Sequence, residues 1–298
     1  MPPARATERA RRRRRKSLSF AALASILLMA MVETSGCVIV KTPPIPQNPA
    51  PISGQDETKF QAQKMLVGLV DRDRRLASVQ SPAVMEYTAG AQHLKAKEEI
   101  VAKRPGNLRV EAMSPFGVAL LLAAQGPDLT IFEPSQNRFM RGTANADTLY
   151  KYVRIPMAPN DAVGLLMGFA PPAFDLGNNP ETVSKDGDMI VATFGRSASG
   201  THQLGFSDGN LAMVRETGAD GRVSYEVRYS DYHDIGGLMF PYVVDATFPE
   251  AGSHVTFRYL RPIVNGVIPD STFVLTPAPG ATMMNLSRYH AGTFSNES

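Results

Sequence analysis

Most of the chain after residue 81 alternates apolar and polar side chains, which is the pattern of β-strands with one buried face. The segments "LRVEAM", "RVSYEVRY" and "HVTFRY" show it most clearly. Their apolar positions are Leu108, Val110, Ala112, Val223, Tyr225, Val227, Tyr229, Val255, Phe257 and Tyr259. Asp-Gly pairs at residues 186–187, 208–209 and 220–221 are typical of hairpin turns. Strands joined in this way predict an antiparallel meander.

Residues 56–78 change to a spacing of three to four, which predicts an amphipathic helix with Asp56 as its N-terminal cap. The apolar positions are Ala62, Met65, Leu66, Leu69, Val70 and Leu76. The polar positions, which we expect to face away from them, are Gln61, Lys64, Asp71, Arg72 and Arg75. We expect the apolar face of this helix to pack in a core rather than on a membrane surface.

Two short helices are predicted between the strand groups, at residues 147–154 and 160–172. Asp161 is in a capping position for the second helix, and Pro171 and Pro172 are expected to end it. Its remaining side chains, among them Leu165, Leu166, Met167 and Phe169, are apolar almost all round. Such a helix has to be enclosed, so it either plugs the interior of a curved sheet or closes one over a cavity.

The first 36 residues have the three parts of a secretion signal. The basic run "RARRRRRK" precedes fifteen mostly apolar residues, 18–32, and small residues occupy positions 34–36. Fifteen helical residues rise about 22 Å, which is short of the ~30 Å core of a bilayer. The pattern therefore predicts export rather than a permanent transmembrane helix.

Cys37 is the only cysteine of the chain, and "TSGC" before and including it resembles the lipobox of bacterial lipoproteins. The resemblance implies that Cys37 is diacylated on sulfur and becomes the new N-terminus. The alternative is an ordinary buried cysteine after a conventional cleavage site. Residues 38–55 carry five prolines and offer Cys37 no core to pack in, and a single cysteine cannot form an internal disulfide.

These features divide the chain into four parts. Residues 1–36 are the predicted lipoprotein signal peptide, and residues 37–55 are the acylated cysteine with a Pro-rich linker. The linker has a reach of about 55 Å in a polyproline conformation. Residues 56–285 are the predicted folded domain, and residues 286–298 a disordered C-terminal tail.

The formal net charge of +3 belongs to the leader alone. Residues 1–36 hold eight of the 31 Lys and Arg residues and two of the 28 acidic ones, so the remainder carries 23 basic and 26 acidic side chains. No basic patch remains that would favour nucleic-acid binding. The composition, 43% hydrophobic and 20% charged, is that of a chain that folds.

Motifs for catalysis and cofactor binding are weak in this sequence. "GFSDG" matches the nucleophile-elbow pattern around Ser207, but its flanks are strand-like and Asp208-Gly209 is a turn signal. The five histidines are scattered without metal-ligand spacing, and there is no phosphate-binding glycine motif. We therefore predict a non-enzymatic protein without metal or cofactor, although carboxylates paired across a meander would not be visible in the sequence.

Adaptable apolar side chains are abundant, with 14 Met and 14 Phe residues. The segments "FGVALLLAAQG" at 116–126 and "GLLMGFAPPAF" at 164–174 hold more apolar residues than a one-sided sheet needs. Two interpretations fit: a plain hydrophobic core, or a ligand cavity for an acyl chain.

Several stretches together resemble the LolA/LolB superfamily of bacterial lipoprotein carriers and receptors. The run from residue 104 to 142 is similar to the family's strands around a Ser-Pro-Phe-Gly turn, here residues 114–117. The helix at 161–172, "FPYVVDATFP" and "VNGVIPDSTFVLTPAPGA" are similar to later family segments in the same order. The similarity covers roughly residues 60–285. Within the superfamily, this chain is most similar in type to the membrane-anchored branch, the LolB-like lipoproteins.

The resemblance implies a mainly β (α+β) fold, a curved antiparallel sheet or incomplete β-barrel closed by short helices over an apolar cavity. From the apolar segments and helices above, the residues expected to line the cavity or its lid are Leu66, Leu69, Leu120, Leu122, Leu165, Leu166, Met167 and Phe169. Phe116 matches the exposed apolar residue of the anchored branch, which is proposed to touch the membrane or the leaving acyl chain. The alternative is that Phe116 caps the core of the barrel.

The predicted function is therefore that of an outer-membrane-anchored lipoprotein facing the periplasm. Its expected partners are acyl chains of lipoproteins or other lipids, and the membrane through its anchor, with no nucleic acid. The protein is expected to be a monomer that assists the localisation or insertion of its cargo. The alternative is a non-catalytic envelope scaffold or sensor in which the same fold has a filled core.

Overall fold

The computed structural model describes residues 54–171, 176, 179–195 and 200–286. The chain divides into two units, Met1–Pro49 and Ala50–Ser298, and all described residues lie in the second. The predicted signal peptide, Cys37 and nearly all of the linker fall outside the described residues. Gly54 and Gln55 already belong to the first helix, and Leu286 is buried.

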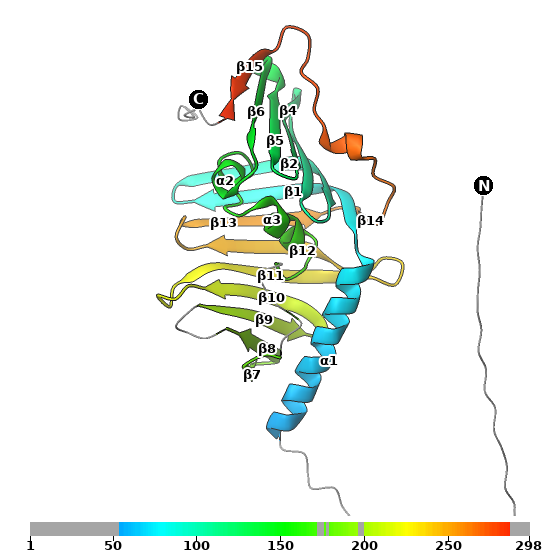
Figure 1. Ribbon diagram of the computed structural model, residues 1–298, viewed down its shortest axis with the longest axis vertical. Coiled ribbons are helices and arrows are strands. Elements are labelled where there is room, and N and C mark those ends of the chain that lie inside the picture. Colours follow the sequence, from blue (N-terminus) through cyan, green and yellow to red (C-terminus); the bar gives the residue numbers. More distant parts are fainter. Residues whose placement is uncertain (1–53, 172–175, 177–178, 196–199, 287–298) are drawn as a thin grey trace, which may run out of the picture. The chain divides into compact units, whose positions relative to one another are not determined.

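A single large sheet dominates the described part of the chain (Figure 1). Its fifteen strands are β1 (Ser78–Ala89), β2 (Gln92–Lys103), β3 (Asn107–Ser114), β4 (Gly117–Gln125), β5 (Asp128–Glu133), β6 (Arg138–Thr143), β7 (Thr182–Asp186), β8 (Met189–Phe194), β9 (Thr201–Ser207), β10 (Asn210–Thr217), β11 (Val223–Asp234), β12 (Met239–Phe248), β13 (Ser253–Tyr259), β14 (Ile263–Val264) and β15 (Thr282–Asn285). All pairs are antiparallel except β15 with β6, which is parallel.

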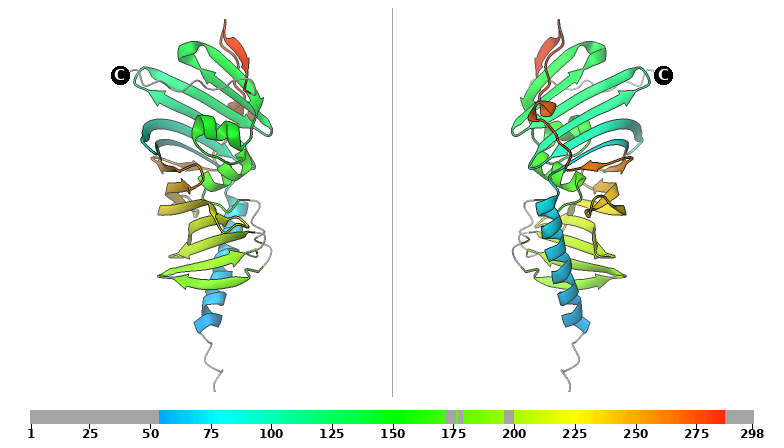
Figure 2. Two further views of the ribbon diagram at one scale, coloured as in Figure 1. Left: turned by 90° about the vertical axis from the view of Figure 1, so that its left-hand side faces the viewer. Right: turned by 90° about the vertical axis from the view of Figure 1, so that its right-hand side faces the viewer.

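The strand order joins two meanders through the middle of the sheet. It runs β15-β6-β5-β4-β3-β2-β1-β13-β12-β11-β10-β9-β8-β7, with β14 beside β1. The pairing of β1 with β13, in which Ala83 lies opposite Tyr259, unites the two halves of the chain. The sheet curves without closing, as the side views show (Figure 2). The predicted incomplete antiparallel barrel is confirmed.

The helices lie along one face of this sheet. Helix α1 (Gly54–Arg75) crosses the strand ends from β7 to β10 (Figure 1). Helices α2 (Ala146–Val153) and α3 (Pro159–Leu166) cover the middle of the sheet, where α3 contacts β2 and β3. Two short 3-10 turns, η1 (Pro134–Gln136) and η3 (Asp270–Phe273), complete the elements.

The predicted helix boundaries need three corrections. Helix α1 begins two residues before Asp56, which sits in its first turn and is not its cap. Asp161 likewise sits in the first turn of α3, because Ala158 is the N-terminal cap and Pro159 the first helical residue. The helix ends at Leu166, well before Pro171, because Gly168 adopts φ +76° and turns the chain.

The hairpins follow the Asp-Gly signals with one exception. Asp208 and Gly209 form a two-residue turn in which both residues have positive φ, 50° and 77°, as the mirror-image turns of hairpins require. Residues 220–221, in contrast, lie within the longer connection between Thr217 and Val223.

The core fills the space between the helices and the face of the sheet that they cover. The alternating apolar residues predicted for three strands supply much of it: Leu108, Val110, Val227, Tyr229, Val255, Phe257 and Tyr259 are all buried there. On the other face, Ala123 and Phe139 form a smaller cluster with Leu275, which belongs to the segment that follows β14. Among the described residues no helix is long and apolar enough to cross a membrane.

Candidate functional site

Helix α3 is enclosed almost completely, as its all-round apolar sequence predicted. Six of its eight residues are buried: Pro159, Ala162, Val163, Gly164, Leu165 and Leu166. The two polar residues of the helix, Asn160 and Asp161, both belong to its first turn. The helix therefore acts as a plug between the sheet and the rest of the chain.

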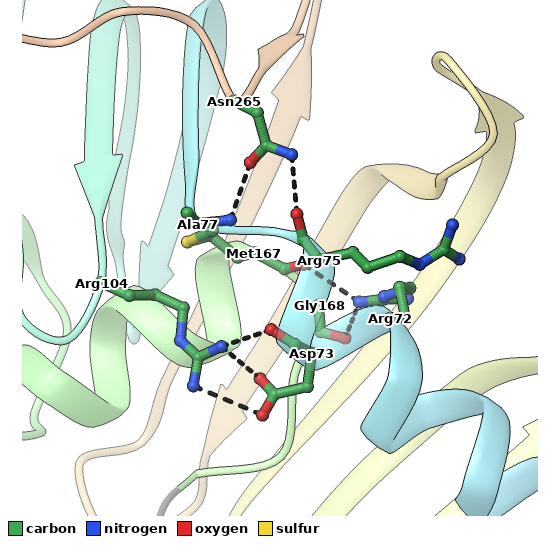
Figure 3. Close-up of polar contacts among 8 residues, drawn as sticks. All are labelled: Arg72, Asp73, Arg75, Ala77, Arg104, Met167, Gly168 and Asn265. Atoms are coloured by element: carbon green, nitrogen blue, oxygen red, sulfur yellow. Dashed lines mark hydrogen bonds and ion pairs between the residues drawn. The ribbon is translucent and has the colours of Figure 1, made fainter.

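The carbonyl groups at the C-terminal end of α3 are bound by side chains from distant elements (Figure 3). Arg72 Nη2 of α1 donates to the carbonyl oxygen of Met167 at 3.1 Å and also to that of Gly168. The hydroxyl of Tyr259 donates to the oxygen of Leu166 at 2.8 Å. These groups satisfy acceptors that a helix end leaves unpaired, and the positive charge of Arg72 suits the C-terminal end of the helix dipole.

Arg72 is a correction to the sequence interpretation, which placed it on the exposed face of the first helix. Its exposure is only 7%, and its guanidinium also lies over the ring of Phe169, 4.8 Å from the centroid. The carbonyl groups of Met167 and Gly168 replace water as partners of its charge. Gly168 allows this approach, because a Cβ there would lie 2.9 Å from Arg72 Nη2.

A second set of contacts fixes the end of α1 beside α3 (Figure 3). Arg104 donates to the backbone oxygen of Asp73 at 2.6 Å and forms an ion pair with its carboxylate at 2.7 Å. Its guanidinium lies 5.2 Å from the centroid of the Phe169 ring. Asn265 bridges the next turn, accepting from the amide of Ala77 and donating to the oxygen of Arg75. Phe169 is thus held between two cations.

A small apolar cavity remains beneath α3. Its volume is about 20 Å³, and every residue around it is apolar. The lining residues are Ile155, Met157, Ala162, Leu165, Leu166, Val227, Val244, Ala246, Phe248, Val255 and Phe257. Binding sites for drug-sized ligands measure roughly 300–1,000 Å³, so an acyl chain enters this space only if α3 moves.

The predicted cavity residues lie in one apolar cluster, but only two of them reach this cavity. Leu165 and Leu166 line it. Leu66, Leu69, Leu122, Met167 and Phe169 are buried elsewhere in the same cluster, and Leu120 is half-buried against it. The lining residues that sequence reasoning missed come mostly from β11, β12 and β13. The alternation of apolar and polar residues in these strands predicts which side chains face the core. It does not predict that they lie below α3, because that depends on the order of the strands in the sheet.

Phe116 is fully exposed, with a relative accessible surface of 100% for the residue. It stands at the turn between β3 and β4, where its amide donates to Ser114 Oγ at 3.2 Å. The hydroxyl of Ser114 donates in turn to the oxygen of Gly117 at 3.0 Å. Phe116 therefore does not cap the core. Met113 on β3 is also exposed, so the hairpin end presents two apolar side chains.

Ser207 has none of the surroundings of a nucleophile elbow. It is the last residue of β9, and the chain continues through the Asp208-Gly209 turn into strand β10, where an elbow needs a helix. The carboxyl group of Asp161 in the first turn of α3 is partly buried, and this burial, with a smaller contribution from Glu216, raises its pKa.

Comparisons with known proteins identify the fold. No protein-family model matches the chain, and no curated protein does. A DUF1329 family protein from Desulfovibrio piger superposes with a TM-score of 0.50 at 11% identity, over 72% of this chain and 96% of that one.

Two further structures match with lower TM-scores. A putative outer membrane lipoprotein-sorting protein domain from Vibrio parahaemolyticus has 0.48 at 10% identity, over 71% and 97% of the two chains. A LolA superfamily protein from Nitrosomonas europaea has 0.47 at 15% identity, over 74% and 97%. At these identities the likeness concerns the fold alone.

Proposed function

We propose that this protein is a lipid-anchored lipoprotein of the outer membrane that faces the periplasm and binds acyl chains beneath α3. No chemistry is needed for this role, because each buried CH₂ group contributes about 0.8 kcal/mol. The acyl chains of lipoproteins or other lipids are the proposed cargo, which the protein would help to localise or insert. The names of the two lipoprotein-sorting and LolA superfamily structures agree with such a role.

The observation that carries the proposal is the plug itself. An apolar helix lies over an apolar sheet face, with an apolar cavity between them. Its C-terminal end is held by a few polar contacts, chiefly those of Arg72 and Tyr259. Displacing α3 exposes a continuous apolar surface, and an acyl chain can then cover that surface in its place.

Binding of a fatty-acid probe tests this proposal. We expect the full chain carrying Cys37→Ala to copurify with lipid in native mass spectrometry and to bind one fluorescent long-chain fatty acid. Hexadecan-1-ol should displace the probe, whereas hexanoate, which buries about ten fewer CH₂ groups, should not. Absence of both copurified lipid and probe binding would contradict the proposal. The filled-core scaffold or sensor, which the small size of the cavity favours, would then be the better account.

Phe116 is proposed to contact the membrane during transfer. We expect Phe116→Ser to leave probe binding unchanged and to slow transfer of the bound probe to phospholipid vesicles by roughly tenfold, because insertion of one Phe side chain is worth about 1.5–3 kcal/mol. Stopped-flow fluorescence with labelled vesicles measures the rate. Val267→Ser is the matched control, since Val267 is 99% exposed but lies outside the β3–β4 hairpin. Equal transfer rates for Phe116→Ser and the unmodified chain would remove this role.

A further inference from the structure

Glu98 is a buried acidic residue on the apolar face of the sheet. It belongs to β2 and is 7% exposed, and it is the one acidic side chain among the buried residues of the described chain. Its neighbours in the sheet are Ala83 on β1 and Ala112 on β3, so small side chains flank it on both sides. Ala83 in turn lies opposite Tyr259, whose hydroxyl holds α3. Glu98 therefore faces the space that α3 covers.

The carboxyl group of Glu98 has no polar partner within the described part of the chain. No hydrogen bond or ion pair reaches it there, and burial by itself raises its pKa to about 7. The titratable groups on the elements around Glu98 do not offset the charge of its carboxylate. Tyr259 donates its hydroxyl proton to the carbonyl oxygen of Leu166, and Asp161 in α3 is itself acidic. A buried carboxylate is costly unless a cation or hydrogen-bond donor meets it.

The position of Glu98 connects it to the cavity beneath α3. The cavity-lining residue Phe257 lies opposite Met85 on β1, and Met85 lies opposite Ala96 on β2, two residues from Glu98 on the same face. The strands β13 and β2 are separated by one strand, which corresponds to about 10 Å. A single amphiphile can span that distance and meet both the apolar wall and the carboxyl group.

We propose that Glu98 is the polar determinant of the site beneath α3, and that the ligand is an amphiphile with an aliphatic chain and a cationic amine. This inference rests on the proposed function, because it names the ligand class of the same site. A protonated amine supplies the charge and the N–H donors that the surrounding protein does not give to Glu98. The residues paired with Glu98 in the sheet are alanines, whose side chains are small, and the chain of the ligand takes the place of α3.

Ligands of equal chain length separate the head group from the chain. Binding of hexadecylamine, hexadecan-1-ol and hexadecanoic acid to the Cys37→Ala full chain is measured by displacement of a fluorescent fatty acid. We expect the amine to bind roughly 10- to 100-fold more tightly than the alcohol, the range for a hydrogen bond to a charged group. The preference should increase as the pH rises through about 7, where Glu98 loses its proton.

Glu98→Gln keeps the shape of the side chain and removes its charge. It should lower the affinity for the amine to that for the alcohol and leave the alcohol unaffected. Glu99→Gln is the matched control, because Glu99 is the next residue of β2 and faces the opposite side of the sheet, near Gln80. The pH profile of the unsubstituted chain provides the same test without any variant at residue 98.

The outcomes distinguish the two proposals. Equal affinities for amine and alcohol, with no change on Glu98→Gln, would overturn the role of Glu98 and leave acyl-chain binding intact. If none of the three ligands binds, the proposed function fails and this inference fails with it.

Discussion

Replacing Cys37 with alanine is expected to abolish labelling with palmitate and to move the protein from the membrane fraction to the soluble fraction. Cys37 lies outside the described residues, so this expectation rests on the "TSGC" pattern and the Pro-rich stretch that follows it. Two or more acyl chains on one residue give stable anchoring, since each buried CH₂ contributes about 0.8 kcal/mol.

The effect should be close to complete, and a conservative neighbour provides its control. Gly36→Ala keeps a small residue before the cysteine and should retain both the label and the membrane association. Metabolic labelling with a palmitate analogue, followed by fractionation, measures both properties in one experiment. A Cys37→Ala protein that remains labelled and membrane-bound would show that the anchor is elsewhere.

The fold was predictable to a large extent because its signals are local. Alternation in "LRVEAM" and "HVTFRY" depends only on the side of the strand that each residue faces, and it placed Leu108 and Phe257 in the core correctly. The turn at Asp208-Gly209 depends on two backbone conformations that Asp and Gly adopt readily. The enclosure of α3 followed from the absence of a polar side.

The candidate site was less predictable because its contacts are distant in the sequence. Arg72 is a charged residue, which a sequence pattern assigns to the exposed face of a helix. Its burial depends on carbonyl groups that are 95 and 96 residues away in the sequence, at the end of α3. The environment of Glu98 depends on the register of three strands, since a shift by one residue would place it on the outer face. The volume of the cavity depends on how closely α3 packs against the sheet, and the spacing of apolar residues in the sequence does not predict that distance.

Locking α3 to the sheet is expected to abolish acyl-chain binding, because the cavity of about 20 Å³ admits a chain only when the helix moves. The first turn of α3 offers a position for the lock. A Cβ built on Gly106, between β2 and β3, would lie 3.0 Å from Cγ and 3.3 Å from the backbone nitrogen of Asn160. Cysteines at these two positions therefore come within the ~3.5–4.5 Å between Cβ atoms that a disulfide spans.

The lock also complements the contacts that already exist. Arg72 and Tyr259 contact the C-terminal end of α3, and the disulfide would hold its start, so the helix could no longer leave the sheet as a whole. In the Cys37→Ala background the two introduced thiols are the only ones in the chain. The single variants Gly106→Cys and Asn160→Cys control for the substitutions themselves, and a reductant controls for the bond.

The measurement that tests the central claim most directly is the binding of a fluorescent long-chain fatty acid to this double variant, before and after reduction. The account predicts no binding in the oxidised protein, and binding equal to that of the single variants once the disulfide is reduced. Undiminished binding in the fully oxidised protein would contradict it, because the acyl chain would then occupy a site that does not require α3 to move.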